Sequence, residues 1–420
     1  MASRPLYRDQ TGLQVSSAGS LHAAGSLRDD ATTRSTATGT TSHWSVNLIL
    51  SAAHPYGGPA IVADLLNVDH QLDLLQELTR AFGPCGQEDE VRAIGQRELG
   101  AWCERVWVDA TENLVGFVPG RSSDDRRAVH VMAHMDELSM IVKRIEPDGA
   151  MRVTPMGGMW PYNFGQGAVE VLGDARTVPG VLSAGSMHTT EESPVQWRSK
   201  EKGENNLLRW MDLRVVTRQS AAQLAEAGVH AGTRVVLARH RRELWPIGDC
   251  VGGYFMDNRA AMVMTLAAMA HLRDAGDQPA HDLYVVFSAR EELGGCGATF
   301  AARNLPGDTS IALDVGPAAT EYGLVLNDQP IVVYGDAATV YHKPLSDHML
   351  NCARQLQLTP QTAVFSSFRS DASIASEYGQ TARAGLLAIP TENTHGYEII
   401  ARRGIDHAAR TLARTLATLP

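Results

Sequence analysis

The sequence predicts an α/β protein whose mixed, largely parallel sheet has helices on both faces and contains an inserted small β-barrel. Two observations support this fold class. Apolar runs such as 128–132 and 281–288 alternate with helix-like segments on either side of the middle of the chain, and continuous apolar runs are typical of strands buried in parallel sheets. Residues 141–244 instead form short alternating segments separated by glycines, a pattern typical of a small barrel or sandwich.

The chain therefore divides into four parts. Residues 1–60 are rich in serine, threonine, alanine and glycine. They have too few large apolar side chains to offset the entropy of ordering, so we expect a flexible tail. The α/β domain follows in two pieces, 61–140 and 245–420, and the barrel is inserted between them at 141–244.

The elements of the α/β domain follow in order from the spacing of apolar residues. Leucines between 65 and 78 are spaced for an amphipathic helix, and a second helix through Val91 and Leu99 has acids at its start. The expected strands are 107–109, 114–117, 128–132, 281–288, 310–313, 363–365 and 385–390. The expected later helices are 260–272, 346–356 and 405–419. The first of these is almost wholly small and apolar, so it must be buried on most sides.

The composition limits the classes of function. A formal net charge of −10, without any stretch dense in lysine or arginine, argues against nucleic-acid binding. No segment approaches the roughly 20 apolar residues of a membrane span, so no membrane partner is expected. The five cysteines are scattered and lack CxxC spacing, which indicates neither a disulfide framework nor a structural zinc site. These features favour an acidic, cytoplasmic protein.

Two adjacent acids, Glu291 and Glu292, follow the apolar run that ends at Ser288. Like charges side by side raise each other's pKa unless a cation lies near them, and a metal ion is the commonest such cation. The alternative is a solvated glutamate pair at the start of a helix, where acids suit the helix dipole.

His134 and Asp136 lie two residues apart at the end of another apolar run. Side chains two apart on a strand point the same way, so Asp136 can hold one imidazole nitrogen of His134 while the other binds a metal. A histidine that is hydrogen-bonded at the start of a loop is the alternative. Asp257, just before the apolar helix, could likewise be only a helix cap.

Most of the candidate site residues lie at or just past the carboxyl ends of predicted strands, which is where doubly wound sheets bind ligands. The candidates are His134, Asp257, Glu291, Glu292, Asp314 and His395. Such a mixture of nitrogen and oxygen donors suits a pair of zinc, cobalt or manganese ions. Two metal ions need one bridging ligand, and one acid is then left to take a proton from water.

The motifs AHMDE, MDNR, REELGGCGA, ALDVG, SDA and IPTENTHG, in this order and at these separations, resemble peptidase family M42. This family of co-catalytic metalloaminopeptidases includes the glutamyl and deblocking aminopeptidases and the TET peptidases. The resemblance runs from about residue 65 to 420 and leaves out the tail. It implies a zinc-peptidase-like fold and two divalent metal ions per subunit, with zinc favoured over cobalt or manganese.

The resemblance also assigns roles to the candidate residues. It implies that Asp257 bridges the two ions, that Glu292 and His395 complete one ion's ligands, and that His134 and Asp314 complete the other's. Glu291 becomes the general base that deprotonates the bridging water, and Asp136 orients His134. The implied substrate is a short peptide or a small amide. The implied assembly is a homo-oligomer, from a dimer to a dodecamer, built through the inserted barrel.

This sequence departs from the family pattern in a few places. Asn258 stands where the family has a second acid, Phe368 and Arg369 stand where it has small residues, and the loop 187–208 is longer than expected. These departures concern the choice of substrate. Arg369 could pair with an acidic substrate group or be an ordinary surface arginine, and Asp371 and His188 are further candidate substrate contacts.

Three other functions remain open on the sequence alone. A metal-dependent amidohydrolase acting on a non-peptide or modified small amide would use the same residues. A glycosidase could use Glu291 with a second carboxylate about 5–10 Å away, but it would leave His134, Asp314 and His395 without roles. An assembly scaffold that has lost catalysis would not need the complete set of metal-binding side chains that the sequence retains.

Overall fold

The computed structural model describes residues 64–420 except 123–126, 187, 191 and 193–207, so the predicted tail lies outside the described residues. In this part of the chain eleven strands form one sheet. They are β1 (Arg105–Val108), β2 (Leu114–Val118), β3 (Val129–His134), β10 (Trp245–Ile247), β11 (Cys250–Tyr254), β12 (Leu283–Ser288), β13 (Thr309–Pro317), β14 (Ile331–Gly335), β15 (Gln361–Val364), β16 (Arg383–Glu392) and β17 (Tyr397–Ala401).

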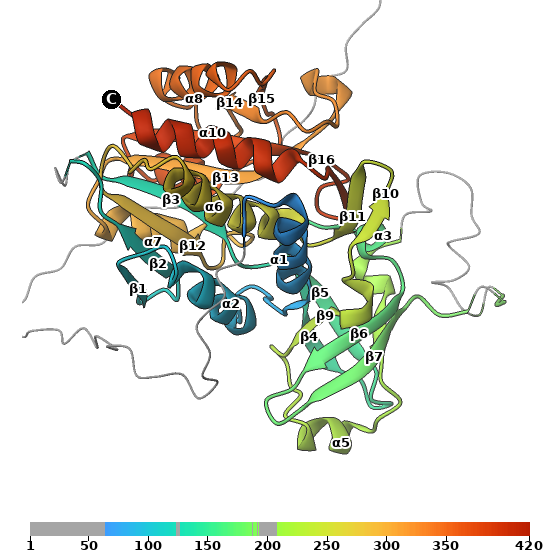
Figure 1. Cartoon of the computed structure of the whole chain (residues 1–420). Helices are drawn as coiled ribbons and strands as arrows, with labels where there is room; N and C mark the ends of the chain where they lie inside the picture. The colour runs from blue at the N-terminus through green and yellow to red at the C-terminus, as the bar shows by residue number, and fades with distance from the viewer. Residues whose placement is uncertain (1–63, 123–126, 187, 191, 193–207) are drawn as a thin grey trace, which may run out of the picture. The chain divides into compact units, whose positions relative to one another are not determined.

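The sheet is mixed, with its central strands parallel (Figure 1). Its order is β1-β2-β12-β3-β13-β16-β17-β11-β10. Outside this order, β14 pairs with β16, and β15 pairs with β14. The pairs β12–β3, β3–β13 and β13–β16 are parallel, whereas β1–β2, β2–β12, β16–β17 and β11–β17 are antiparallel. Because the parallel strands end at one edge, the residues that follow them are brought together there.

Nine helices are described outside the short 3₁₀ turns, and those outside the inserted barrel pack on both faces of the sheet. They are α1 (Val68–Arg80), α2 (Asp89–Leu99), α3 (Pro161–Phe164), α5 (Ala221–Glu226), α6 (Met256–Asp274), α7 (Cys296–Asn304), α8 (Lys343–Gln355), α9 (Asp371–Glu377) and α10 (Gly404–Thr418). Along β12, Val285 and Phe287 join the core that contains α6 and α10. The alternate residues, such as Val286, join the core that contains α7. This alternation places helices on both faces and confirms the predicted fold class.

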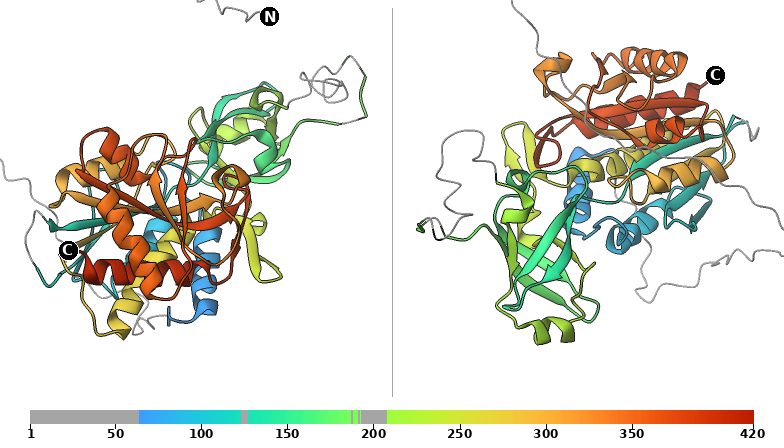
Figure 2. Two further views of the ribbon diagram at one scale, coloured as in Figure 1. Left: turned by 90° about the horizontal axis from the view of Figure 1, so that it is seen from above. Right: turned by 180° about the vertical axis from the view of Figure 1, so that it is seen from behind.

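The middle of the chain forms a closed barrel (Figure 1). Its strands are β4 (Ser139–Ile145), β5 (Met151–Met156), β6 (Gly167–Leu172), β7 (Thr177–Ser183), β8 (Arg214–Val216) and β9 (Arg234–Leu237), closed in the order β4-β5-β8-β7-β6-β9. Figure 2 shows the same strands from two further sides. Alternate residues such as Val169 and Val171 fill the interior, as the short alternating segments predict.

No helix among the described residues is long and apolar enough to cross a membrane.

A buried group of three charges joins the barrel to the large sheet. Glu137, which follows β3, accepts from Arg242 at 2.5 and 3.0 Å and from Nη2 of Arg259 at 3.0 Å. All three side chains are fully buried. Arg242 follows the barrel and also donates to main-chain oxygens of α1 and the residues after it, while Arg259 belongs to α6. One carboxylate therefore neutralises cations from both sides of the junction.

Glu137→Gln should lower the free energy of unfolding by about 3–5 kcal/mol, because it leaves two buried guanidinium groups without a counter-charge. Urea unfolding followed by tryptophan fluorescence measures this change. The matched control is Glu77→Gln, which breaks a pair with Arg97 in which both side chains are 46% exposed. Exposed pairs contribute less than about 1 kcal/mol. Equal effects of the two substitutions would contradict this role of Glu137.

Candidate metal centre and catalytic site

The sheet brings five candidate residues to one of its edges. His134 ends β3 and pairs with Ser288 at the end of β12, so Glu291 and Glu292 begin just beyond it. Asp314 lies in the adjacent strand β13, opposite Ala388 of β16. His395 lies in the turn between β16 and β17. This arrangement therefore agrees with the expectation that the candidate residues lie at the ends of the strands.

Asp257 reaches the same edge from the start of α6. Asp257 and Asn258 have non-helical backbone angles within that helix, and the peptide bond between them is cis. The main-chain N–H of Asp257 donates to the Glu398 carboxylate at 3.0 Å. This contact fixes the residue so that its side chain faces the sheet edge instead of capping the helix.

The Asp257 carboxylate lies between the two histidines. Its Oδ1 is 3.0 Å from Nε2 of His134, and its Oδ2 is 3.6 Å from Nε2 of His395. Two groups of potential ligands therefore share Asp257. One group is His134, Asp257 and Asp314, and the other is Asp257, Glu292 and His395. In each group the ligand atoms all lie within 4.8 Å of one another. The structure thus brings together all five predicted metal ligands.

The outer nitrogen of each histidine is held by main-chain oxygen. Nδ1 of His395 is 2.6 Å from the main-chain oxygen of Gly158, a barrel-side residue. Nδ1 of His134 is 3.2 Å from the main-chain oxygen of Asp136 and 3.6 Å from its carboxylate. Such contacts fix the tautomer and leave Nε2 available as a metal ligand. The main-chain oxygen of Asp136 is therefore the closer partner of His134.

The electrostatics of the site favour bound cations. Burial raises the pKa of Glu291, Glu292 and Asp314 well above their ordinary values, and neighbouring carboxylates add to the effect. Burial also opposes ionisation of Asp257, but its contacts with His134 outweigh this and hold its pKa low. In addition, Oε1 of Glu292 is buried without a hydrogen-bond partner among the described residues. These donor types and the unpartnered oxygen fit divalent metal ions.

Asp136 positions both adjacent glutamates. Its Oδ1 accepts from the main-chain N–H of Glu291 at 2.9 Å, and its Oδ2 accepts from that of Glu292 at 3.1 Å. The side chain is fully buried, so these two bonds are strong constraints on the loop after β12. Sequence spacing predicts a contact of Asp136 with His134, but it could not predict this contact with a segment 155 residues away.

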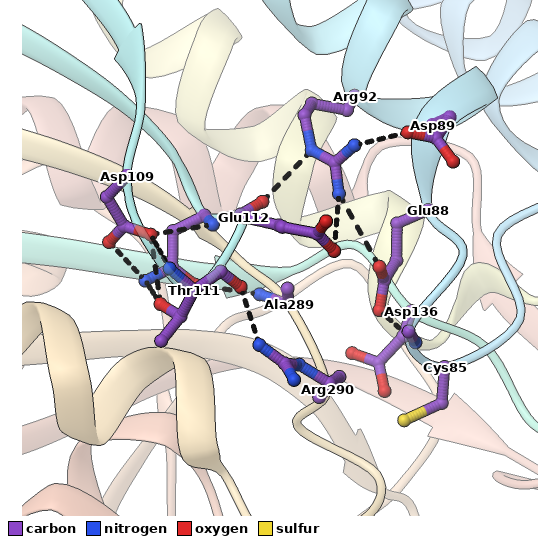
Figure 3. A network of polar contacts seen from close by, with 12 residues as sticks. Cys85, Glu88, Asp89, Arg92, Asp109, Thr111, Glu112, Asp136, Ala289 and Arg290 are labelled. Atoms are coloured by element: carbon purple, nitrogen blue, oxygen red, sulfur yellow. Dashed lines mark hydrogen bonds and ion pairs between the residues drawn. The ribbon is translucent and has the colours of Figure 1, made fainter.

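Figure 3 shows a network of polar side chains that includes Asp136. Cys85 and Glu88 lie close to its carboxylate, and burial raises the pKa of both. Farther along, Nη2 of Arg290 donates to the main-chain oxygen of Thr111, and Asn113 accepts from the main-chain N–H of Ala289. These contacts anchor the chain just before Glu291. Sequence reasoning missed Cys85 and Glu88, although the glycines flanking this GPCGQE loop mark a tight turn.

The candidate ligands line a cavity of about 450 Å³. The wall includes all five candidate ligands, Glu291, and the segment Ser366, Ser367, Phe368 and Arg369. The structure does not place Asp371 or His188 on this wall. Asp371 is buried at the start of α9, where it accepts from Ser288 at 2.6 Å, and burial raises its pKa to about 6. His188 is exposed in the loop after the barrel strand β7.

The sequence is similar to those of known aminopeptidases. A family model described as M42 glutamyl aminopeptidase matches residues 113–411. A putative aminopeptidase of Acetivibrio thermocellus is 23% identical over 361 residues, which cover 83% of this chain and 99% of that protein.

Solved structures share the fold. The aminopeptidase APDkam598 of Desulfurococcus kamchatkensis has a TM-score of 0.73 at 23% identity, covering 83% of this chain and 95% of that one. The TET1 peptidase of Pyrococcus horikoshii, which can assemble into a tetrahedron or a large octahedral shell, has a TM-score of 0.71 at 21% identity. That match covers 83% of this chain and all of the other.

Fold, site and relatives together define a hydrolase that acts on peptide bonds. Because the family model matches well over half of the chain, the chain belongs to the M42 peptidase family, whose members are metal-dependent aminopeptidases. This membership confirms the resemblance seen in the motifs.

Asp136→Asn should weaken metal binding or activity by about 10- to 100-fold. An asparagine offers only one acceptor oxygen, so one of the two main-chain N–H groups would face an NH₂ group instead. Metal affinity by chelator competition and peptide hydrolysis measure the loss. The matched control is Asp174→Asn, which alters an exposed histidine–aspartate pair with His230 and should change neither quantity. Unaltered metal affinity and activity in Asp136→Asn would refute the positioning role.

Proposed function

We propose that this protein is a dinuclear-metal aminopeptidase that removes N-terminal residues from short peptides. The observation that carries the proposal is the sharing of Asp257, whose two carboxylate oxygens face different histidines. Paired ions about 3.5–4 Å apart are typical of aminopeptidases. We assign His134, Asp257 and Asp314 to one ion, and Asp257, Glu292 and His395 to the other.

Zinc is the ion that this set of ligands suits best, with cobalt or manganese as alternatives. When bound, two divalent ions would lower the pKa of a water molecule and polarise the scissile carbonyl. The protein itself supplies the fixed orientation of the ligands, through Gly158, Asp136 and Glu398.

Glu291 is the proposed carrier of the proton. It lines the same cavity but belongs to neither group of ligands among the described residues. Its raised pKa makes it a better proton acceptor than an ordinary carboxylate. We assign it the removal of a proton from the attacking water and the delivery of that proton to the leaving amino group.

The alternative functions have less support. A glycosidase gives no role to the two histidines that face Asp257, and an inactive scaffold gives no role to the complete set of ligands. A metal-dependent amidohydrolase acting on a small non-peptide amide would use the same residues. Release of amino acids from peptides distinguishes the proposed aminopeptidase from that amidohydrolase.

Glu291→Gln and its neighbour Glu292→Gln form a matched pair of variants. Glu291→Gln should lower kcat by about 10²–10⁴-fold and keep both ions, because this residue only transfers a proton. Glu292→Gln should lose metal as well as activity, because it removes a ligand. Amino-acid release from short peptides and elemental analysis of the purified proteins measure the two effects. Loss of an ion from the Glu291→Gln protein, or wild-type activity in it, would contradict the division of roles.

We further propose that Arg369 contacts acidic N-terminal side chains of substrates. It is the one lysine or arginine among the described residues that line the cavity. Its Nη2 donates to Glu377, and both side chains remain partly exposed. Glu377 is not part of the cavity wall, so a substrate carboxylate can compete with it for the guanidinium group.

Arg369→Ala should lower kcat/KM for peptides with N-terminal glutamate, relative to leucine, by about fivefold, the equivalent of a partly exposed ion pair. Glu377→Gln should shift the same ratio in the opposite direction, because it frees the guanidinium group. A panel of dipeptides assayed with both variants measures this. If neither variant changes the ratio, Arg369 is an ordinary surface arginine.

We propose that the protein is a homo-oligomer in the cytoplasm, between a dimer and a dodecamer in size. Trp160 and Tyr162, at α3 beside the barrel, are 62% and 67% exposed, and their rings stack with an interplanar angle of 2°. Exposed aromatic groups of this kind mark interaction surfaces. All five cysteines are free thiols, which suits a reducing compartment.

Light scattering should give a mass that is a multiple of the 45.3 kDa chain. Replacing both Trp160 and Tyr162 by serine should lower this mass, because it removes the apolar surface that a second copy would cover. The control is Val340→Ser, which changes a residue that is 85% exposed and remote in sequence from the barrel. A wild-type mass of a single chain at micromolar concentration would exclude the oligomer.

A further inference from the structure

A second cavity, of about 140 Å³, lies at the amino-terminal ends of the parallel strands. Arg127 precedes β3, His281 precedes β12, and Arg383 begins β16. The register aligns these strand starts, because Val129 pairs with Leu283 and Thr309 pairs with Arg383. The metal ligands follow the other ends of the same strands, about 20 Å away for strands of six residues. This cavity is therefore distinct from the catalytic site.

Arginine and histidine side chains dominate the polar part of the second cavity's wall. It carries two arginines, Arg127 and Arg383, and three histidines, His281, His342 and His348, and no carboxylate side chain among the described residues lines it. This gathering occurs in a chain with a formal net charge of −10. One nearby acid, Asp308, pairs with Nη2 of Arg383 at 2.5 Å. That pair neutralises part of the charge but leaves the three histidines and Arg127 on the wall.

Several nitrogens in this wall lack hydrogen-bond partners among the described residues. They are Nδ1 of His281, Nδ1 of His342 and Nε of Arg383. His281 is only 6% exposed, and its Nε2 already contacts the main-chain oxygen of Pro420 at 3.3 Å. A buried polar atom without a partner costs about 1–3 kcal/mol. Three such atoms lie beside one cavity, and a ligand there would complete their hydrogen bonds after small rotations of the side chains.

The helix α8 adds a further attraction for negative charge. His342 is its N-cap residue and makes no side-chain capping bond, and Pro344 and Leu345 in its first turn also line the cavity. The N-terminus of a helix carries partial positive charge and favours anions. The helix and the basic side chains therefore act in the same direction.

We propose that this cavity binds a small tetrahedral oxyanion of the phosphate type. A volume of about 140 Å³ leaves room for one such ion. Arginine and histidine donors from four strand or helix ends can surround such an ion on several sides. The proposal does not depend on the aminopeptidase mechanism, because none of the catalytic residues lines this cavity.

The test is calorimetric titration of the metal-loaded protein with inorganic phosphate, at constant ionic strength set by chloride. Glycerol 3-phosphate, titrated separately, distinguishes a site for the free ion from a site for a phosphorylated metabolite. Phosphate should bind, and Arg383→Gln should weaken it by about tenfold or more, the equivalent of one charge-assisted hydrogen bond. His342→Asn, which leaves the Arg383–Asp308 pair intact, should also weaken binding.

Two controls locate the binding. Arg402→Gln breaks a similar arginine–aspartate pair with Asp69 on another surface and should leave the affinity unchanged. His395→Ala alters the proposed metal centre and should likewise leave it unchanged. Phosphate binding that is lost in His395→Ala but kept in Arg383→Gln and His342→Asn would place the ion at the metal centre and overturn the proposal. So would an absence of binding, which would mean that the chain's own groups already neutralise the cavity.

Discussion

The gathering of negative charge at one buried edge of the sheet is the constraint on which the rest of the structure depends. Burying an unpaired carboxylate costs several kcal/mol, yet Asp257, Glu291, Glu292 and Asp314 lie around a single cavity. The fold compensates by holding Asp136 with two main-chain N–H groups and by setting His134 between Asp136 and Asp257. The remaining charge makes the edge a candidate site for cations.

Asp136 and Glu137 show how one turn serves both the chemistry and the architecture. The first carboxylate holds the loop that carries the two glutamates. The second neutralises Arg242 from beyond the barrel and Arg259 from α6. Because Asp136 and Glu137 are adjacent, a displacement at the junction of the barrel and the sheet would also shift Asp136 and the loop that it holds. The contact of Gly158 with His395 is a second such link, so the barrel and the candidate metal centre are joined by two contacts.

The sequence could place most of the candidate ligands at one edge of the sheet, because they lie at or near the ends of apolar runs and parallel strands end at the same edge. It could not predict what supports them. Cys85 and Glu88 reach Asp136 from a loop that precedes the sheet, and Arg242 reaches Glu137 across 105 residues. Asp371, a candidate substrate contact, instead begins α9 and accepts a hydrogen bond from Ser288. Long-range contacts of this kind leave no local pattern in the sequence.

The central claim is that two metal ions share Asp257. The most direct measurement is anomalous X-ray diffraction at the zinc edge from crystals of the zinc-loaded protein. The account predicts two peaks per chain, one beside His134 and Asp314 and the other beside Glu292 and His395. A single peak, or a peak at Cys85, Glu88 and Asp136 in place of either, would contradict it.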